Sequence, residues 1–137
     1  MRIAKKISPS NQSSKIISKN ETSLIHFEIK HERIHVSPKQ ILFLEAADHY
    51  IKALIDSDEG KVWVTRHCQL HKMLELINDE NFILGNRFYI VNIRVITEIK
   101  EEKIDGKQRI IIFFGKNCKV MLTHGINQYI KQMLLSK

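Results

Sequence analysis

The sequence is poor in the residues that mark several classes of protein. Its two cysteines, Cys68 and Cys118, are too few for a disulfide framework, so we expect a reducing, cytoplasmic environment. No apolar run reaches the roughly 18 residues that a membrane-spanning helix needs. The basic start of the chain is not followed by the apolar stretch of a secretory signal. Disulfide-stapled, membrane-spanning and secreted classes are therefore disfavoured.

Glycine and catalytic signatures are equally scarce. The five glycines are dispersed, and they form neither a phosphate-binding loop nor a Gly-x-Ser-x-Gly nucleophile motif. Carboxylate pairs at 79–80 and 101–102 flank expected turns, where acidic side chains are ordinarily solvated. We therefore expect no enzymatic activity, no cofactor and no small-molecule substrate.

The net charge of +7 is concentrated at the start of the chain. Residues 1–23 carry five basic residues and one acid among six serines, whereas residues 24–137 carry 17 basic residues and 14 acids. This contrast predicts a flexible basic leader over residues 1–23 and one folded domain over residues 24–137. A basic balance indicates a polyanionic partner such as nucleic acid, although the domain itself is only mildly basic.

Short apolar runs between turn signals predict a mostly β domain with about seven strands in packed antiparallel sheets, and two helices. We expect strands at residues 24–30, 50–56, 61–65, 88–91, 93–99, 110–114 and 118–122, with a short buried apolar run at 41–44. The expected turns are 58–60, Asp105-Gly106 and 115–117. Apolar residues at helical spacing predict short helices at about 66–77 and 124–135, capped by Thr65 and Thr123. Their apolar stripes are Leu70, Met73, Leu74 and Ile77 in the first helix, and Ile126, Tyr129, Ile130, Met133 and Leu134 in the second.

One short motif could hold a metal. In His67-Cys68-x-x-His71, two histidines four apart on a helix would share a face, as zinc ligands do. No second Cys/His pair completes a ligand set at the usual spacing, so we predict no metal site. A small metal-dependent enzyme that uses these three residues stays open as a rival hypothesis.

The most informative segment runs from Phe82 to Ile93. Asn86 and Arg87 precede an apolar run, and Asn92 lies within it. An asparagine in an apolar strand needs hydrogen-bond partners, so we expect Asn92 to satisfy loop backbone. The forked guanidinium of Arg87 is suited to a phosphate or to a guanine edge.

This segment resembles the signature of the LytTR DNA-binding domain family, which reads approximately F-x-R-x-H-R-S-Y-x-V-N. The residues that match in register are Phe82, Arg87, Tyr89, Val91 and Asn92. Flanking blocks agree as well: 41–46 with 49–51, the helix at 70–77, and 122–124 before the last helix. The resemblance covers about residues 24–137 and implies an elongated antiparallel β-sandwich with two short helices.

The resemblance also implies a function. LytTR domains are transcription regulators that reach successive major grooves of double-stranded DNA with loops between strands. We therefore expect a cytoplasmic, sequence-specific, two-component-like effector without a receiver domain, bound as a homodimer to repeated half-sites. The carried-over DNA contacts are His49 and Tyr50 in a first loop, Asn86 and Arg87 in a second, and His124 at the start of the last helix. Lys52, Arg66 and His67 can add contacts to the DNA backbone.

The sequence departs from the family pattern at four positions. Leu84 replaces an arginine, Asn86 a histidine, Phe88 a serine and His124 an arginine. Because the family uses such positions at DNA, the departures motivate a rival hypothesis, a LytTR-like fold that serves as a protein–protein regulatory module. An exposed Phe88 would support the protein partner, and a buried Phe88 would leave the DNA interpretation intact.

Overall fold

The computed structural model describes residues 24–136 as two antiparallel sheets and two short helices. The predicted leader, residues 1–23, lies outside the described residues. Strands of the seven-stranded sheet follow the order β2-β1-β5-β4-β3-β7-β6, and the smaller sheet has the order β10-β9-β8. The strands are Ile25–Ile29 (β1), Glu32–Val36 (β2), Ile41–Ala46 (β3), Ile51–Ser57 (β4), Gly60–Arg66 (β5), Phe82–Asn86 (β6), Tyr89–Asn92 (β7), Glu98–Ile104 (β8), Lys107–Phe113 (β9) and Lys119–Leu122 (β10). The α-helices are Leu70–Ile77 (α1) and Gln128–Leu135 (α2), and Pro38–Gln40 (η1) and Ile93–Val95 (η2) are short 3₁₀ helices.

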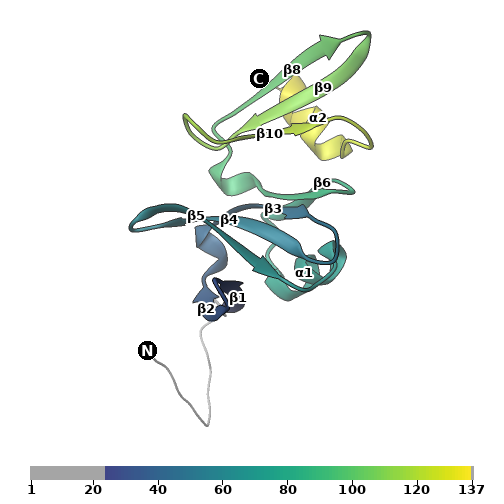
Figure 1. Cartoon of the computed structure of the whole chain (residues 1–137). Helices are drawn as coiled ribbons and strands as arrows, with labels where there is room; N and C mark the ends of the chain where they lie inside the picture. Colours follow the sequence, from purple (N-terminus) through teal and green to yellow (C-terminus); the bar gives the residue numbers. More distant parts are fainter. Residues whose placement is uncertain (1–23, 137) are drawn as a thin grey trace.

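The seven-stranded sheet lies between two apolar layers. Helix α1 covers one face, and the three-stranded sheet with α2 covers part of the other (Figure 1). Successive residues of a strand contribute alternately to the two layers, because their side chains point to opposite faces of the sheet. On β3, for example, Leu44 faces α1 and Phe43 faces the smaller sheet, and both are buried. The mostly β sandwich with two helices that the sequence predicted is confirmed.

A β-bulge in β3 directs an extra apolar residue toward the smaller sheet. The pairing of β3 with β4 shifts between Ile41 and Phe43, so that Leu42 and Phe43 both reach the layer between the sheets. Two residues on one strand then face one on its partner, as in other bulges. Phe43 uses this position to stack on Phe114 at a centroid distance of 5.3 Å.

The three expected hairpin turns are confirmed. Asp105 and Gly106 join β8 to β9 with φ angles of 54° and 78°, and positive φ at both central residues is the backbone that Asp-Gly favours. Residues 58–59 connect β4 to β5, and residues 114–118 connect β9 to β10. Turn residues thus located the hairpins, while the number of strands was underestimated: β2 and β6 were not foreseen.

Both helices exist but begin later than the sequence suggested. Thr65 is not an N-cap, because β5 continues to Arg66, which pairs with Ile51 of β4. The N-cap of α1 is Gln69. Likewise Thr123 does not cap α2. Asn127 does, and its side-chain oxygen accepts a hydrogen bond from the N–H of Tyr129 at 2.6 Å.

The apolar stripes of the helices are confirmed with one exception. Met73 and Ile77 of α1 are buried, and Ile130 of α2 is fully buried. Tyr129, by contrast, is 50% exposed and does not belong to the buried face of α2. Among the described residues, no helix has the length and apolar character needed to cross a membrane.

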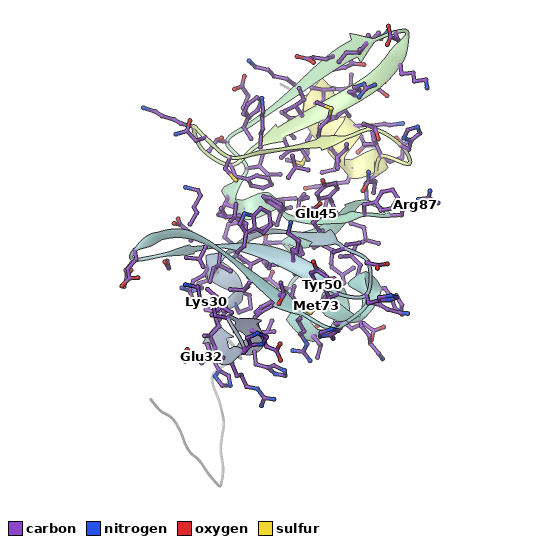
Figure 2. The ribbon with its side chains drawn as sticks, viewed as in Figure 1. Lys30, Glu32, Glu45, Tyr50, Met73 and Arg87 are labelled. Atoms are coloured by element: carbon purple, nitrogen blue, oxygen red, sulfur yellow. The ribbon has the colours of Figure 1, made fainter. Side chains whose placement is uncertain are left out.

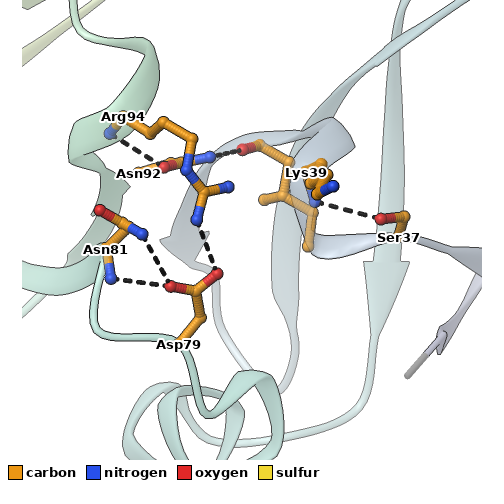
Figure 3. A network of polar contacts seen from close by, with 7 residues as sticks. Ser37, Lys39, Asp79, Asn81, Asn92 and Arg94 are labelled. Atoms are coloured by element: carbon orange, nitrogen blue, oxygen red, sulfur yellow. Dashed lines mark hydrogen bonds and ion pairs between the residues drawn. The ribbon is translucent and has the colours of Figure 1, made fainter. Parts of the chain in front are cut away.

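Asn92 anchors the chain where it passes from the large sheet to the small one. This fully buried side chain donates through Nδ2 to the carbonyl of Ile41 at 2.9 Å, and its Oδ1 accepts from the N–H of Arg94 at 3.1 Å (Figure 3). Arg94 in turn pairs with Asp79 at 3.1 Å. The expectation that Asn92 satisfies backbone is confirmed, whereas the strand expected at 93–99 begins only at Glu98 because η2 precedes it.

Candidate nucleic-acid interface

Three connections that are far apart in the sequence are joined by hydrogen bonds at one edge of the protein. The first is the β3–β4 connection, residues 47–50; the second is the β6–β7 turn, Arg87 and Phe88; the third is the β10–α2 connection, residues 123–127. The N–H of Ala46 donates to the carbonyl of Phe88 at 2.8 Å, which joins the end of β3, directly before the first connection, to the second. The N–H of Asn127 donates to the carbonyl of Gly85 at 2.8 Å, which joins the third to β6.

Asn127 makes three hydrogen bonds that hold the third connection in place. Besides the backbone bond and the cap of α2, its Nδ2 donates to the carbonyl of Leu84 at 2.8 Å. Gly85 lets the buried Leu122 pack closely against β6, since a Cβ at this position would lie 3.1 Å from Cδ1 of Leu122. Neither residue was predicted from the sequence, although asparagine is among the residues that most favour the N-cap of a helix.

The β6–β7 turn presents Arg87 to solvent. Asn86 and Tyr89 are paired across the strands, so Arg87 and Phe88 form a two-residue turn, and the side chain of Arg87 points away from the body of the protein (Figure 2). The guanidinium carbon of Arg87 lies 4.9 Å from the ring centroid of Phe88. Within the described chain Arg87 forms no ion pair, so its charge is available to a partner.

Asn86, unlike the exposed Arg87, is buried. Its side chain is only 6% exposed, and its Oδ1 accepts a hydrogen bond from the N–H of Phe88 at 2.9 Å. Asparagine commonly stabilises a turn in this way by mimicking backbone. In the free protein Asn86 therefore shapes the turn that carries Arg87.

A hollow of about 490 Å³ separates the first two connections from the start of α1. Its lining includes His49, Tyr50, Cys68, His71 and Arg87. Three residues that the sequence proposed for DNA thus line one concavity. His67 adjoins them, because its ring lies 6.2 Å from that of Tyr50.

The His67-Cys68-x-x-His71 motif does not have the expected helical geometry. His67 precedes α1, which begins at Leu70, so the two histidines do not occupy one helical face. No group of three or more His, Cys, Asp or Glu side chains in residues 24–136 is arranged to hold a metal ion.

Lys52 and Arg66 make contacts away from this hollow. The ammonium of Lys52 lies 4.7 Å from the ring centroid of the exposed Trp63. Arg66 donates through Nη1 to the carbonyl of His26 at 3.2 Å and so ties β5 to β1. Neither residue lines the hollow that contains Arg87.

His124 lies in the third connection, and its expected position at a helix N-terminus is wrong. Three residues separate it from Gln128, where α2 begins, so the free N–H groups of the first helical turn are not beside it. Its Nδ1 lies 2.9 Å from Oγ1 of Thr123. His124 is exposed, with Lys107 and Lys131 lining the same hollow.

Comparison with known families shows to which family this chain belongs. A family model described as the LytTr DNA-binding domain matches residues 31–135. The chain belongs to the LytTR DNA-binding domain family. This membership assigns it the role of a DNA-binding regulator.

Solved structures agree on the fold of this LytTR domain. It is similar to a structure described as a LytTr DNA-binding domain from Bacillus cereus, with a TM-score of 0.63 and 21% sequence identity. The similarity covers 83% of this chain and 98% of the other. No curated protein matches the sequence.

Proposed function

We propose that this LytTR domain is a sequence-specific transcriptional regulator that reads the major grooves of double-stranded DNA through its three braced connections. The observation that carries the proposal is the pair of bonds from Ala46 to Phe88 and from Asn127 to Gly85. These bonds fix three exposed connections relative to one another, and a fixed set of contacts is what discrimination between sequences requires.

Arg87 is the principal base contact in this proposal. It is exposed at the tip of a tight turn, it has no acidic partner among the described residues, and the Asn86–Phe88 bond fixes the turn beneath it. A guanidinium can donate two parallel hydrogen bonds to O6 and N7 of guanine, and no other base pair presents that pattern in the major groove.

The remaining residues divide into two groups. His49, Tyr50 and His67 lie around the hollow beside Arg87 and are placed to contact the flanking phosphates. Lys52 and Arg66 are held by Trp63 and by the backbone of His26, so we assign them at most a long-range electrostatic contribution. Asn86 supports Arg87 and does not itself read a base. A homodimer on repeated half-sites, in the cytoplasm, completes the proposal.

The test is selection from a random duplex library followed by sequencing, with the wild type and Arg87→Ala in parallel. We expect the wild type to enrich a repeated motif. Truncation of Arg87 is expected to weaken binding to that motif by about 1–3 kcal/mol and to relax one position within it. Duplex binding without any enriched motif would contradict sequence-specific recognition.

One observation favours a second function, a protein–protein regulatory module. Phe88 is 45% exposed at the tip of the β6–β7 turn, which the sequence analysis named as the sign of a protein partner. A single exposed aromatic residue is common on protein surfaces, however, and Arg87 covers part of its ring. Phe88→Ser separates the two functions: a protein module would lose its partner, whereas a DNA reader would keep its motif.

A further inference from the structure

A second basic hollow lies beside the third connection, apart from the one that contains Arg87. Its volume is about 370 Å³, and Lys107 and Gln108 of β9, His124 of the third connection and Lys131 of α2 contribute to its lining. A smaller adjoining hollow of about 140 Å³ also contains Arg109. We call these two hollows together the β9–α2 cleft.

The cleft exists because β10 is shorter than its neighbour. β10 pairs with β9 only from Lys119 opposite Phe113 to Leu122 opposite Ile110. The outer part of β9, Lys107–Arg109, continues beyond this point with β8 on its other side. In the described part of the chain no strand fills the space beside it, and the third connection turns away there toward α2.

The charges that border the cleft are positive and unpaired. In the described residues, neither Lys107, Lys131 nor Arg109 has a carboxylate oxygen within ion-pair distance. The Nε atom of Arg109 is buried without a hydrogen-bond partner, and its Nη1 contacts the sulfur of Met121 at 3.8 Å. Glu101 is not in the lining, and its Oε2 accepts a hydrogen bond from Gln108 at 2.6 Å.

The backbone elements that border the cleft project to the same side of the protein as Arg87. In Figure 1 the β8–β9 turn and the β10–α2 connection project to the side on which Figure 2 shows Arg87. The third connection belongs to both the candidate interface and the cleft, because Asn127 ties it to β6 while His124 lines the cleft. A duplex held at the three connections therefore passes the mouth of the cleft.

We propose that the β9–α2 cleft binds a backbone phosphate of duplex DNA, with Lys107 and Lys131 as the charged contacts; this inference rests on the proposed function. An ammonium is a compact charge that contacts phosphate without the two-pronged geometry that reads a base. The cleft accordingly adds affinity and fixes register, and it contributes no sequence preference.

The test measures how duplex binding depends on salt. Each neutralised phosphate contributes about 0.9 to the slope of log K against log salt for B-DNA. Fluorescence anisotropy of a labelled duplex over a KCl series should therefore give a slope reduced by about 0.9 in Lys107→Gln/Lys131→Gln, because one phosphate contact is lost. The ratio of affinities for the selected motif and a scrambled duplex should stay unchanged.

Two control variants make the result specific. Lys116→Gln/Lys119→Gln removes the same charge from the opposite end of the small sheet, at the β9–β10 turn, and should keep the wild-type slope. Lys107→Arg/Lys131→Arg keeps the charge in the cleft and should also keep the slope. Circular dichroism of each variant confirms that the fold is intact.

The outcomes separate the inference from the proposed function. A wild type that binds duplex DNA, with an equal slope in the cleft and the control double variants, would overturn the cleft alone. A reduced affinity ratio in the cleft variant would also overturn it, because the lysines would then read sequence. A wild type without measurable duplex binding would overturn the proposed function and the cleft together.

Discussion

Asn127 and Gly85 are joined by a 2.8 Å hydrogen bond from the backbone N–H of the first to the carbonyl of the second. This bond crosses from the start of α2 to the end of β6, and it places the third connection next to the turn that carries Arg87. The amide of Asn127 reinforces it through Leu84 and caps α2 through Tyr129. One side chain thus couples helix formation to the geometry of the candidate interface.

Asn127→Ala should therefore destabilise the protein and disturb the third connection. Loss of the cap costs about 1 kcal/mol, and loss of the bond to Leu84 costs about 1 kcal/mol more. We expect the free energy of unfolding, measured with urea, to fall by about 2 kcal/mol. Asn127→Asp keeps the cap acceptor but not the donor, so it should lose about half as much; an equal loss in both variants would contradict the separate contributions.

Asn92→Leu should be among the most damaging single substitutions. The side chain is fully buried, so its removal leaves the carbonyl of Ile41 and the N–H of Arg94 without their partners. Each unsatisfied buried group costs about 1–3 kcal/mol, and we expect a loss of about 2–4 kcal/mol in urea unfolding. Asn81→Ala is the control, because it removes a partly exposed amide from the same network. A similar, small loss in both variants would contradict the anchoring role of Asn92.

Arg87→Lys should separate charge from base reading. The charge remains, so the salt dependence of duplex binding should stay close to that of the wild type. Two-pronged hydrogen bonding is lost, so preference for the selected motif should fall by about 1–3 kcal/mol. Arg33→Lys on β2, at the far edge of the large sheet, is the matched control and should leave the preference unchanged. A retained preference in Arg87→Lys would remove Arg87 from base reading.

His26 should make stability depend on pH. Its pKa is lowered from the usual 6.5, first by burial and then by the positive charges of Arg66 and Arg33 and by His35, with Glu28 opposing them. The unfolded chain consequently binds a proton more readily than the folded one between the lowered pKa and 6.5. Stability contributed by neutral His26 is present above pH 6.5 and is lost as the pH falls toward the folded pKa.

The measurement is urea unfolding at a series of pH values from neutral to about pH 5. His26→Gln should flatten the decline below pH 6.5, because the titrating group is gone. His71→Gln, which removes an exposed histidine from α1, serves as the control. An equally steep decline in wild type and His26→Gln would show that other groups carry the pH dependence.

The sequence predicted most where structure is decided locally. Asp105-Gly106 specified a hairpin because its backbone preference matches the turn, and Leu70 to Ile77 specified a helix through their spacing. The helix starts were misplaced where distant pairing decided them. Thr65 resembles an N-cap, but the β4–β5 hairpin continues through it into Arg66.

The candidate site was predictable as a set of residues and not as an arrangement. Family resemblance identified Arg87 and His49, which do line one hollow. It could not show that Asn86 is buried beneath the turn, since that follows from the hydrogen bond to Phe88. The resemblance also could not show that Lys107 and Lys131 line one hollow, because that depends on where β10 ends and on how α2 packs.

The position of β6 at the edge of the seven-stranded sheet has a consequence for solubility. An edge strand exposes backbone groups that can pair with a strand of another molecule, which is a common route to aggregation. Here the carbonyls of Leu84 and Gly85 are already occupied by Asn127, so the start of α2 acts as a cover over the last strand. The same residue that orders the interface thus also occupies two of the backbone groups through which a strand of another molecule could pair with β6.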